Sequence, residues 1–379
     1  MAVACIEDLR LIARRRLPRA VFDFVDGGAL DEVSLRANRS DFERLALAPR
    51  VLTDVSRRDA STTLLGEPLA LPLVIAPTGL AGLLARKGEV SLARAAQQAG
   101  IIYCLSQMSA CSVEEVAAAT PRPFWFQTYL LKQRSINESL LQRAQHAGCR
   151  VLVVTVDTKA QGPRDRDVRN GFTIPPRVTL RNAFDVARRV HWLRDVAFGP
   201  RLTFANLAPS LNLKAGDLIS VARFAAEQYD FTVSWSDIDW CRERWPGKLV
   251  LKGILDPEDA RRALEHGVDA IIVSNHGGRQ LDGAPSPFAV LADIVEAVQG
   301  RAEVILDGGV RRGSDVLKAL ALGARACMAG RPFLYGLAAD GERGVTKAID
   351  LLRNEIDNNL ALLGRPVARE LDRTALRRP

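Results

Sequence analysis

From residue 71 onward, short apolar runs alternate with segments whose hydrophobic residues recur at helical spacing. Short runs rich in β-branched residues predict buried strands, and recurrence every three to four residues predicts helices. We expect eight strands, at Leu71–Ala76, Ile101–Leu105, Phe124–Thr128, Val151–Val156, Leu249–Ile254, Ala270–Ser274, Glu303–Leu306 and Ala326–Ala329. Helices are expected between most of them, at Glu89–Gln98, Val113–Ala119, Ser135–Ala147, Pro257–Glu265, Pro287–Val298 and Ser314–Leu322.

This alternation predicts an α/β fold, a (β/α)8 TIM barrel that occupies about residues 71–340 of a single domain spanning 1–379. The competing fold is an open, doubly wound sheet. Such a sheet usually places Gly-x-Gly-x-x-Gly after its first strand, and here Pro77-Thr78-Gly79-Leu80 stands at that point. The barrel is therefore the favoured fold.

Helices are also expected before the barrel begins. Residues 6–16 have the pattern of a helix, and Phe22–Ala29 has that of a helical turn ending in glycines. Asp31–Arg44 predicts a further amphipathic helix. The barrel is thus preceded by N-terminal helices.

The connection between the fourth and fifth strands is much longer than the others. Its last part, Ser234–Arg244, predicts the usual barrel helix, so that about 165–232 is an insertion. It follows the carboxyl end of a strand, where barrel enzymes keep their active sites. A long loop in that place is commonly a lid or a docking surface.

Composition restricts the class of protein. The chain is 47% hydrophobic and 25% charged, which is typical of a globular protein, and no apolar run reaches the roughly 20 residues that span a bilayer. The start lacks a signal-peptide pattern. The six cysteines are scattered without a Cys-x-x-Cys pair, which indicates reduced cytoplasmic thiols and neither a metal site nor a disulfide framework.

The net charge of +8 is unevenly distributed. Residues 14–19 hold four arginines, and residues 177–214 hold seven basic and two acidic residues. In 188–198, arginines alternate with apolar residues. This pattern fits either a lid or subunit contact with a solvated basic face, or peripheral contact with the inner face of a membrane. Nucleic acid is not an expected partner, because no aromatic residues are interleaved on a strand pattern.

In a (β/α)8 barrel the site lies at the carboxyl ends of the strands. Every expected strand ends in a hydrogen-bonding or charged group, and these groups are Pro77-Thr78, Ser106, Gln127, Tyr129, Thr155, Asp157, Lys252, Ser274, His276, Asp307–Arg311 and Gly330-Arg331. After the last two strands, glycines and an arginine stand together, which predicts the usual barrel phosphate site.

The residues at the remaining strand ends suit a planar ring, which would be a second part of the ligand that carries the phosphate. Ser106, Gln127 and Thr155 are neutral hydrogen-bonding residues that suit a planar heterocycle, and Lys252 would stabilise that ring if it became anionic. A phosphate and such a ring together suggest flavin mononucleotide (FMN). His276, Asp157, Arg279 and Tyr129 would then face a second, anionic ligand.

Three motifs carry a resemblance to a known family. They are Ser274–Asp282 (SNHGGRQLD), Leu306–Gly313 (LDGGVRRG) and Lys318–Gly323 (KALALG). Nearly end to end, the chain resembles the FMN-dependent enzymes that oxidise (S)-2-hydroxy acids: glycolate oxidase, the flavin L-lactate dehydrogenase and (S)-mandelate dehydrogenase. The resemblance implies an FMN cofactor, a small 2-hydroxy acid substrate and a homotetramer.

The resemblance also implies a role for each matching residue. His276 is the general base, and Asp157 supports the imidazolium that forms. Lys252 stabilises the reduced flavin. Arg279 and Arg164 hold the substrate carboxylate, and Tyr129 lies near the reacting oxygen. The expected cofactor site comprises Lys252 with Pro77, Thr78, Gly79, Ser106, Gln127 and Thr155 at the ring, Gly309, Arg311 and Arg331 at the phosphate, and Ser274, Asp307 and Gly330.

One position departs from the family pattern. Most members have a tyrosine where this chain has Phe24, and a phenylalanine cannot donate a hydrogen bond to the substrate carboxylate. An apolar wall is gained instead, which favours a mandelate-like substrate, with lactate next. Three alternatives stay open: a glycolate-type oxidase that uses oxygen, another FMN barrel enzyme such as an isomerase, and a flavin-binding protein without catalysis. The electron acceptor can be a quinone, a cytochrome or oxygen.

Overall fold

A closed barrel of eight parallel strands forms the centre of the molecule. The computed structural model describes residues 2–172, 179–197, 199, 202–211 and 218–378. The strands are β4 Leu73–Ile75, β5 Ile102–Ser106, β6 Trp125–Thr128, β7 Val151–Thr155, β8 Lys248–Ile254, β9 Ala270–Ser274, β10 Glu303–Asp307 and β11 Ala326–Ala329. All eight predicted strands and the predicted fold are confirmed, with strand ends shifted by one or two residues.

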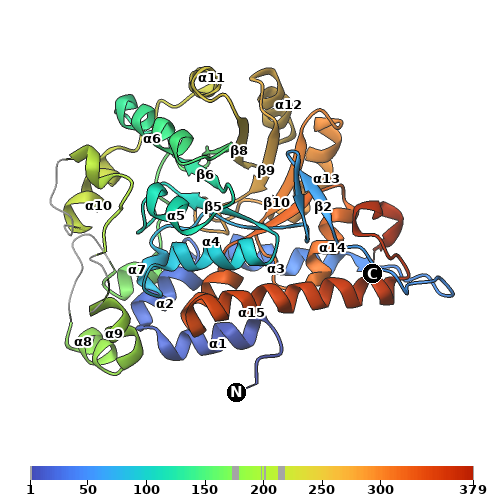
Figure 1. Ribbon diagram of the computed structural model, residues 1–379, viewed down its shortest axis with the longest axis horizontal. Helices are drawn as coiled ribbons and strands as arrows, with labels where there is room; N and C mark the ends of the chain where they lie inside the picture. Colours follow the sequence, from blue (N-terminus) through green and yellow to red (C-terminus); the bar gives the residue numbers. More distant parts are fainter. Residues whose placement is uncertain (1, 173–178, 198, 200–201, 212–217, 379) are drawn as a thin grey trace.

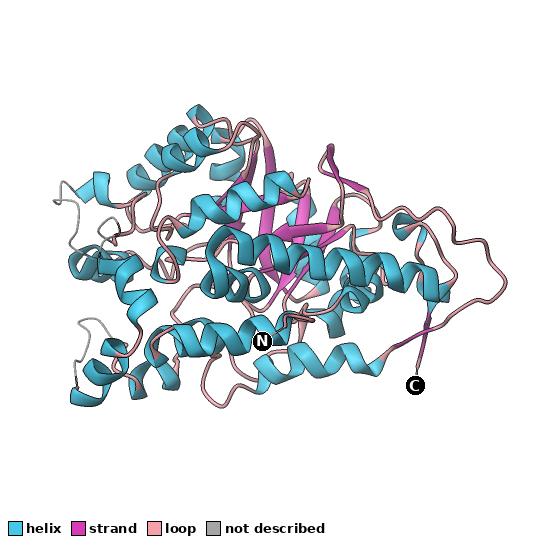
Figure 2. Cartoon of the chain, turned by 60° about the horizontal axis from the view of Figure 1, so that its bottom comes forward, coloured by secondary structure: helices cyan, strands magenta, loops and turns pink. Residues whose placement is uncertain are grey.

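The barrel strands read as continuous apolar runs because both of their faces are covered. Every residue of β7 and β9 is buried. Side chains such as Val74, Trp125 and Ile272 fill the barrel interior. The opposite faces pack against an outer ring of helices, which Figure 2 shows around the strands.

The outer ring confirms the predicted helices. It comprises α4 Gly88–Gln98, α5 Val113–Ala119, α6 Arg134–His146, α11 Trp235–Arg244, α12 Pro257–Glu265, α13 Pro287–Val298, α14 Gly313–Ala321 and α15 Arg331–Leu363. The helix α15 is interrupted by a kink at Asp340 and Gly341. Two small sheets lie outside the barrel, β1 Ala46–Leu47 with β12 Leu376–Arg377, and β2 Thr62–Leu64 with β3 Glu67–Leu69.

Before the barrel the chain forms α1 Ile6–Arg16, α2 Arg19–Asp26, α3 Val33–Ser40 and the 3₁₀ helix η1 Asp41–Arg44. The predicted single helix over residues 31–44 is thus an α-helix that begins two residues later and continues as a 3₁₀ helix to the predicted end at Arg44. Glu32 has a left-handed backbone (φ 61°), so that the α-helix begins only at Val33, and its last residues tighten into η1. In Figure 1, α1 lies beside α15, against which it packs.

The insertion between β7 and α11 forms the left side of the molecule in Figure 1. It contains α7 Asp165–Arg169, α8 Leu180–Ala187, α9 Val190–Ala197, the 3₁₀ helix η3 Ala208–Leu211 and α10 Leu218–Glu227. The indole Nε1 of Trp192 donates a hydrogen bond to the carbonyl oxygen of Leu83 (2.7 Å), which ties α9 to the loop after β4. Of the predicted basic stretch, Arg177, Arg201 and Lys214 lie outside the described residues.

Candidate active site

A cavity of about 400 Å³ opens at the carboxyl end of the barrel. Its walls come from the loops after the strands, from α2 and from the insertion. Among its lining residues are the predicted site residues Phe24, Pro77, Thr78, Gly79, Tyr129, Arg164, Lys252, His276, Arg279, Asp307, Gly309, Arg311, Gly330 and Arg331. The structure thus brings most of the predicted site together around one space.

The other predicted site residues stand beside this lining, at the ends of the strands. Parallel pairing sets Ser106 next to Gln127, Thr155 next to Lys252, and Ser274 next to Asp307. Two of these pairs are also linked by side chains. The hydroxyl of Ser106 donates to Gln127 Oε1 (2.9 Å), and that of Ser274 donates to Asp307 Oδ2 (2.7 Å). Asp157 stands behind His276, which lines the cavity, and contacts its ring.

Lys252 is a buried cation at the cavity. Its ammonium donates to Ser274 Oγ (2.9 Å) and forms an ion pair with Asp307 Oδ2 (2.7 Å). Burial lowers the pKa of Lys252, but attraction to Asp307 and Asp157 outweighs it and leaves this pKa raised. The lysine therefore keeps its positive charge at the cavity.

His276 and Asp157 form a hydrogen-bonded pair. The imidazole Nδ1 lies 3.0 Å from Asp157 Oδ1, which leaves Nε2 for a second partner. Burial raises the pKa of Asp157, but His276 and Lys252 outweigh this effect and lower it. His276 also has a left-handed backbone (φ 57°), which is uncommon outside glycine and is a feature of functional sites. The pair can accept a proton at Nε2 and stabilise the cation that results.

Two arginines face an aromatic pair in the same cavity. The guanidinium carbons of Arg279 and Arg164 lie 5.1 Å and 5.4 Å from the ring centre of Phe24. The ring of Phe172 lies 4.8 Å from that of Phe24. Arg164 also forms an ion pair with Asp167 (3.1 Å). The site therefore combines a binding place for an anion with an apolar wall.

The loops after β10 and β11 form a positively charged corner. Gly309 has φ 83°, and a side chain there would clash with the backbone of Asn38, so only glycine fits. Arg311 is partly buried, and its pKa is lowered by desolvation and by repulsion from Arg331. Within the described residues neither guanidinium pairs with a carboxylate. Asp26 attracts both groups only from a distance, so the corner keeps a positive charge that is suited to a phosphate.

Sequence reasoning missed the part of the wall that the insertion supplies. Asp167, Phe172, Phe204 and Tyr229 all line the cavity. They lie within the insertion, away from the strand ends, and form no motif. The aromatic character of this wall can be recognised only in the folded structure, where the insertion lies against the barrel.

The donors at the cavity fit FMN. The hydroxyl of Thr78 and the amide nitrogen of Gln127 are buried without a hydrogen-bond partner in the protein, as expected where a heterocyclic ligand would supply the acceptors. Lys252 would hold the pyrimidine side of the ring. Arg311 and Arg331 would hold the phosphate.

Comparisons with known proteins show the family of the chain. A profile of the FMN-dependent dehydrogenases matches residues 13–378. The chain is 47% identical over 365 residues to an L-lactate dehydrogenase of Caulobacter vibrioides, covering 96% of this chain and 95% of the relative. It is 40% identical to the solved monotopic membrane protein (S)-mandelate dehydrogenase, with a TM-score of 0.96 and full coverage of both chains. A mandelate oxidase solved with (S)-4-hydroxymandelic acid has a TM-score of 0.84 at 38% identity, covering 99% of this chain and 98% of the other.

Proposed function

The chain belongs to the family of FMN-dependent dehydrogenases, and we propose that it oxidises an (S)-2-hydroxy acid of the mandelate type to the 2-oxo acid, with lactate as the next candidate. The observation that carries this proposal is the convergence of a base and an anion site in one cavity. His276 with Asp157 stands at the same space as Arg279 and Arg164. The Phe24 and Phe172 rings supply an apolar surface for an aromatic side chain.

Each residue has a defined part in this reaction. Arg279 and Arg164 bind the substrate carboxylate, which orients the 2-hydroxyl group toward the base. His276 takes a proton at Nε2, and Asp157 stabilises the imidazolium. FMN bound in the cavity would accept the two electrons of the oxidation. Lys252 holds a positive charge where negative charge develops.

For the electron acceptor, we propose a quinone in a membrane that the insertion touches from one side. Leu180, Phe184 and Val190 are exposed by 93%, 65% and 60%, respectively. Arg188 and Arg194 are exposed beside them, and the similar (S)-mandelate dehydrogenase is described as a monotopic membrane protein. Within the described residues no helix is long and apolar enough to cross a bilayer, so the contact would be peripheral, on the cytoplasmic face.

The direct test is visible absorbance of the purified protein under anaerobic conditions. We expect a yellow protein whose band near 450 nm (roughly where oxidised flavins absorb) is bleached by (S)-mandelate. Bleaching by L-lactate alone would keep the chemistry and refute the mandelate preference. A yellow protein that neither acid bleaches would contradict the proposal and favour the non-catalytic alternative.

Admitting air after the bleaching distinguishes dehydrogenase from oxidase. A dehydrogenase should regain its colour slowly in air and rapidly with a soluble quinone analogue. Recovery in air that is as fast as recovery with the quinone would support the oxygen-using alternative instead.

A variant tests the base. His276→Ala should keep FMN, because His276 is not part of the positively charged corner, and should lose turnover by a factor of at least about 10³. The measurement is steady-state oxidation of (S)-mandelate by protein with equal FMN content. Near-normal turnover would refute the role of His276.

A further inference from the structure

The C-terminal turn of α2 contacts two arginines of the site through its backbone. The last carbonyl groups of a helix have no partner within the helix. Here the oxygen of Phe24 accepts from Arg279 Nη1 (2.6 Å), and that of Val25 accepts from Arg331 Nε (2.9 Å). The oxygen of Gly27 accepts from both guanidinium groups, at 3.1 Å and 2.8 Å.

Carbonyl groups orient an arginine without cancelling its charge, which a carboxylate would do. Within the described residues no carboxylate lies within ion-pair distance of Arg279 or Arg331, although Asp26 attracts Arg331 from farther away. Burial, followed by repulsion from Arg164 and Arg331, lowers the pKa of Arg279 well below its ordinary value. The two guanidinium groups are therefore held close enough to repel each other, and a bound anion would offset this repulsion.

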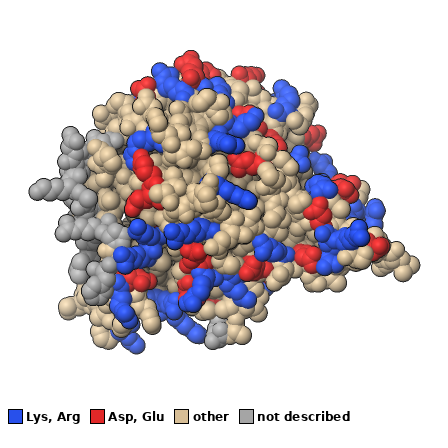
Figure 3. Space-filling view, in the orientation of Figure 1, with Lys and Arg blue, Asp and Glu red and all other residues tan. Residues whose placement is uncertain are grey.

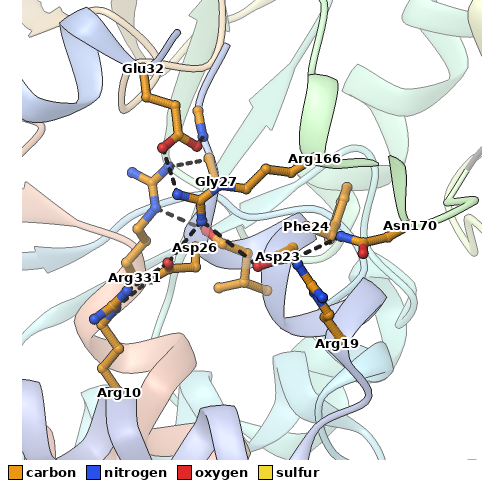
Figure 4. A network of polar contacts seen from close by, with 12 residues as sticks. Arg10, Arg19, Asp23, Phe24, Asp26, Gly27, Glu32, Arg166, Asn170 and Arg331 are labelled. Atoms are coloured by element: carbon orange, nitrogen blue, oxygen red, sulfur yellow. Dashed lines mark hydrogen bonds and ion pairs between the residues drawn. The ribbon is translucent and has the colours of Figure 1, made fainter. Parts of the chain in front are cut away.

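Asp26 anchors the turn that carries these carbonyl groups (Figure 4). This carboxylate is 7% exposed and accepts from Arg10 Nε and Nη2, at 2.6 Å and 2.8 Å. It also accepts from the hydroxyl of Tyr335 (2.7 Å) and from Arg166 Nη1 (3.3 Å). These partners come from α1, α15 and α7, so the turn is fixed from three sides.

We propose that Asp26 is a positioning residue for both anion sites, acting through the α2 turn on Arg279 and Arg331 at once. This inference rests on the proposed function, which assigns Arg279 to the substrate carboxylate and Arg331 to the FMN phosphate. The shared acceptor, the Gly27 carbonyl, makes the two sites depend on one piece of backbone. A residue that touches neither ligand therefore sets the affinity for both.

The test is Asp26→Asn, which keeps the size of the side chain and removes its charge. The dissociation constant of FMN is measured by quenching of its fluorescence on titration into the flavin-free protein. That of phenylglyoxylate, a 2-oxo acid, is measured by its effect on the spectrum of the FMN-loaded protein. We expect both constants to rise by about tenfold, the amount that a lost charge-assisted contact produces, with kcat at saturation within about threefold of wild type.

The matched control is Asp23→Asn on the same helix. Asp23 contacts Arg19, Arg166 and Asn170 and makes no hydrogen bond to Arg10 or Tyr335, so both dissociation constants should stay within about twofold of the wild-type values. If Asp26→Asn fails to fold, Tyr335→Phe removes one of the anchoring bonds and should raise both constants by about threefold. An unchanged constant for either ligand, or equal effects of the control, would overturn the shared positioning role.

A second ligand with a carboxylate group, benzoate, tests this inference independently of the proposed reaction. Benzoate cannot be oxidised as a 2-hydroxy acid is, and its carboxylate is expected to bind at Arg279 and Arg164. If no hydroxy acid bleaches the wild-type flavin, the proposed function fails, but the effect of Asp26→Asn on FMN and benzoate binding still decides the positioning role. If the wild type turns over normally and both constants are unchanged in the variant, only the inference fails.

Discussion

At the scale of single residues, Phe24 has a role beyond that of an apolar wall. Its ring contacts both Arg164 and Arg279, which repel each other, and it packs on Phe172. An aromatic face can bring two cations near one another at lower cost than an aliphatic side chain. Phe24 thus holds the two arginines of the proposed anion site together, although it offers no hydrogen bond.

The Phe24→Tyr variant should bind small substrates more tightly. A hydroxyl near the carboxylate adds one hydrogen bond to a charged group, worth about 1 to 2 kcal/mol. We expect KM for L-lactate to fall by about 5- to 20-fold, with a smaller gain for (S)-mandelate. Steady-state kinetics with both acids is the measurement, and Phe24→Leu is the comparison that removes the ring. An unchanged ratio of kcat/KM for the two acids would contradict a role of Phe24 in selectivity.

Asp26 gives a prediction for stability against pH. Burial raises its pKa, but hydrogen bonds from Arg10 and Tyr335 lower it to about 2, against an ordinary 3.8. Because the pKa is depressed on folding, the stabilisation is complete above about pH 3.8 and is lost as the pH falls toward 2. This shift in the pKa of Asp26 corresponds to about 2 kcal/mol of unfolding free energy.

The measurement is urea unfolding of flavin-free wild type and Asp26→Asn at pH 6 and pH 3. The difference in unfolding free energy between the two proteins should shrink by about 1 kcal/mol at the lower pH. A difference that is independent of pH would show that Asp26 has no depressed pKa in the folded protein.

At the level of secondary-structure elements, α3 braces the loop that carries His276, the proposed base. Asn38 and Asn275 exchange two side-chain hydrogen bonds, at 2.8 Å and 2.7 Å, and both residues are buried. Asn275 Oδ1 also accepts from the backbone of Gly278 (3.0 Å). His276 stands between these glycine and asparagine contacts with its left-handed backbone. The brace holds a conformation that the local sequence would not keep by itself.

Removing the brace should lower kcat and leave cofactor binding nearly intact. In Asn38→Ala, His276 loses the support of Asn275, and a small displacement of a base costs about 10- to 100-fold in rate. The FMN content and KM should change little. The control is Arg36→Ala, an exposed residue of α3 that bonds to the backbone of Asp31. Equal kcat in Asn38→Ala and wild type would refute the brace.

At the scale of the whole molecule, two basic segments far apart in the sequence come together. The backbone N–H of Arg19 donates to Asp185 Oδ2 (2.6 Å), and Arg189 donates to the carbonyl oxygen of Arg15. Figure 3 shows Lys and Arg side chains gathered at the lower left, over α1, α8 and α9. This surface joins positive charge with the exposed apolar residues of α8 and α9, the combination that favours an anionic membrane.

Sedimentation with anionic vesicles at low salt tests this surface. Wild-type protein should pellet with the vesicles, and a variant with Leu180→Ser, Phe184→Ser and Val190→Ser should remain in the supernatant while keeping its turnover. The control is Phe231→Ser, which removes a comparably exposed aromatic residue (66%) outside α8 and α9. Full recovery of the wild type in the supernatant would count against membrane contact.

The barrel and most of the site residues could be predicted from the amino-acid sequence alone. Burial on both faces imposes an unbroken apolar pattern on each strand, and this signal is local enough to locate all eight. Because the carboxyl ends of such strands converge, polar residues such as Lys252 and His276 could be assigned to one site from the sequence alone. Gly308 and Gly309 of the positively charged corner could be predicted in the same way, because they directly follow the end of a strand.

The distant segments that complete this site could be identified only from the packing of the folded chain. The Phe172 wall, the Asn38 brace and the α2 turn anchored by Asp26 all reach the cavity from outside the barrel. Local periodicity reports how deeply a residue is buried and does not report what it is buried against. The orientation of Arg279 and Arg331 therefore depends on backbone carbonyl groups that no sequence motif records.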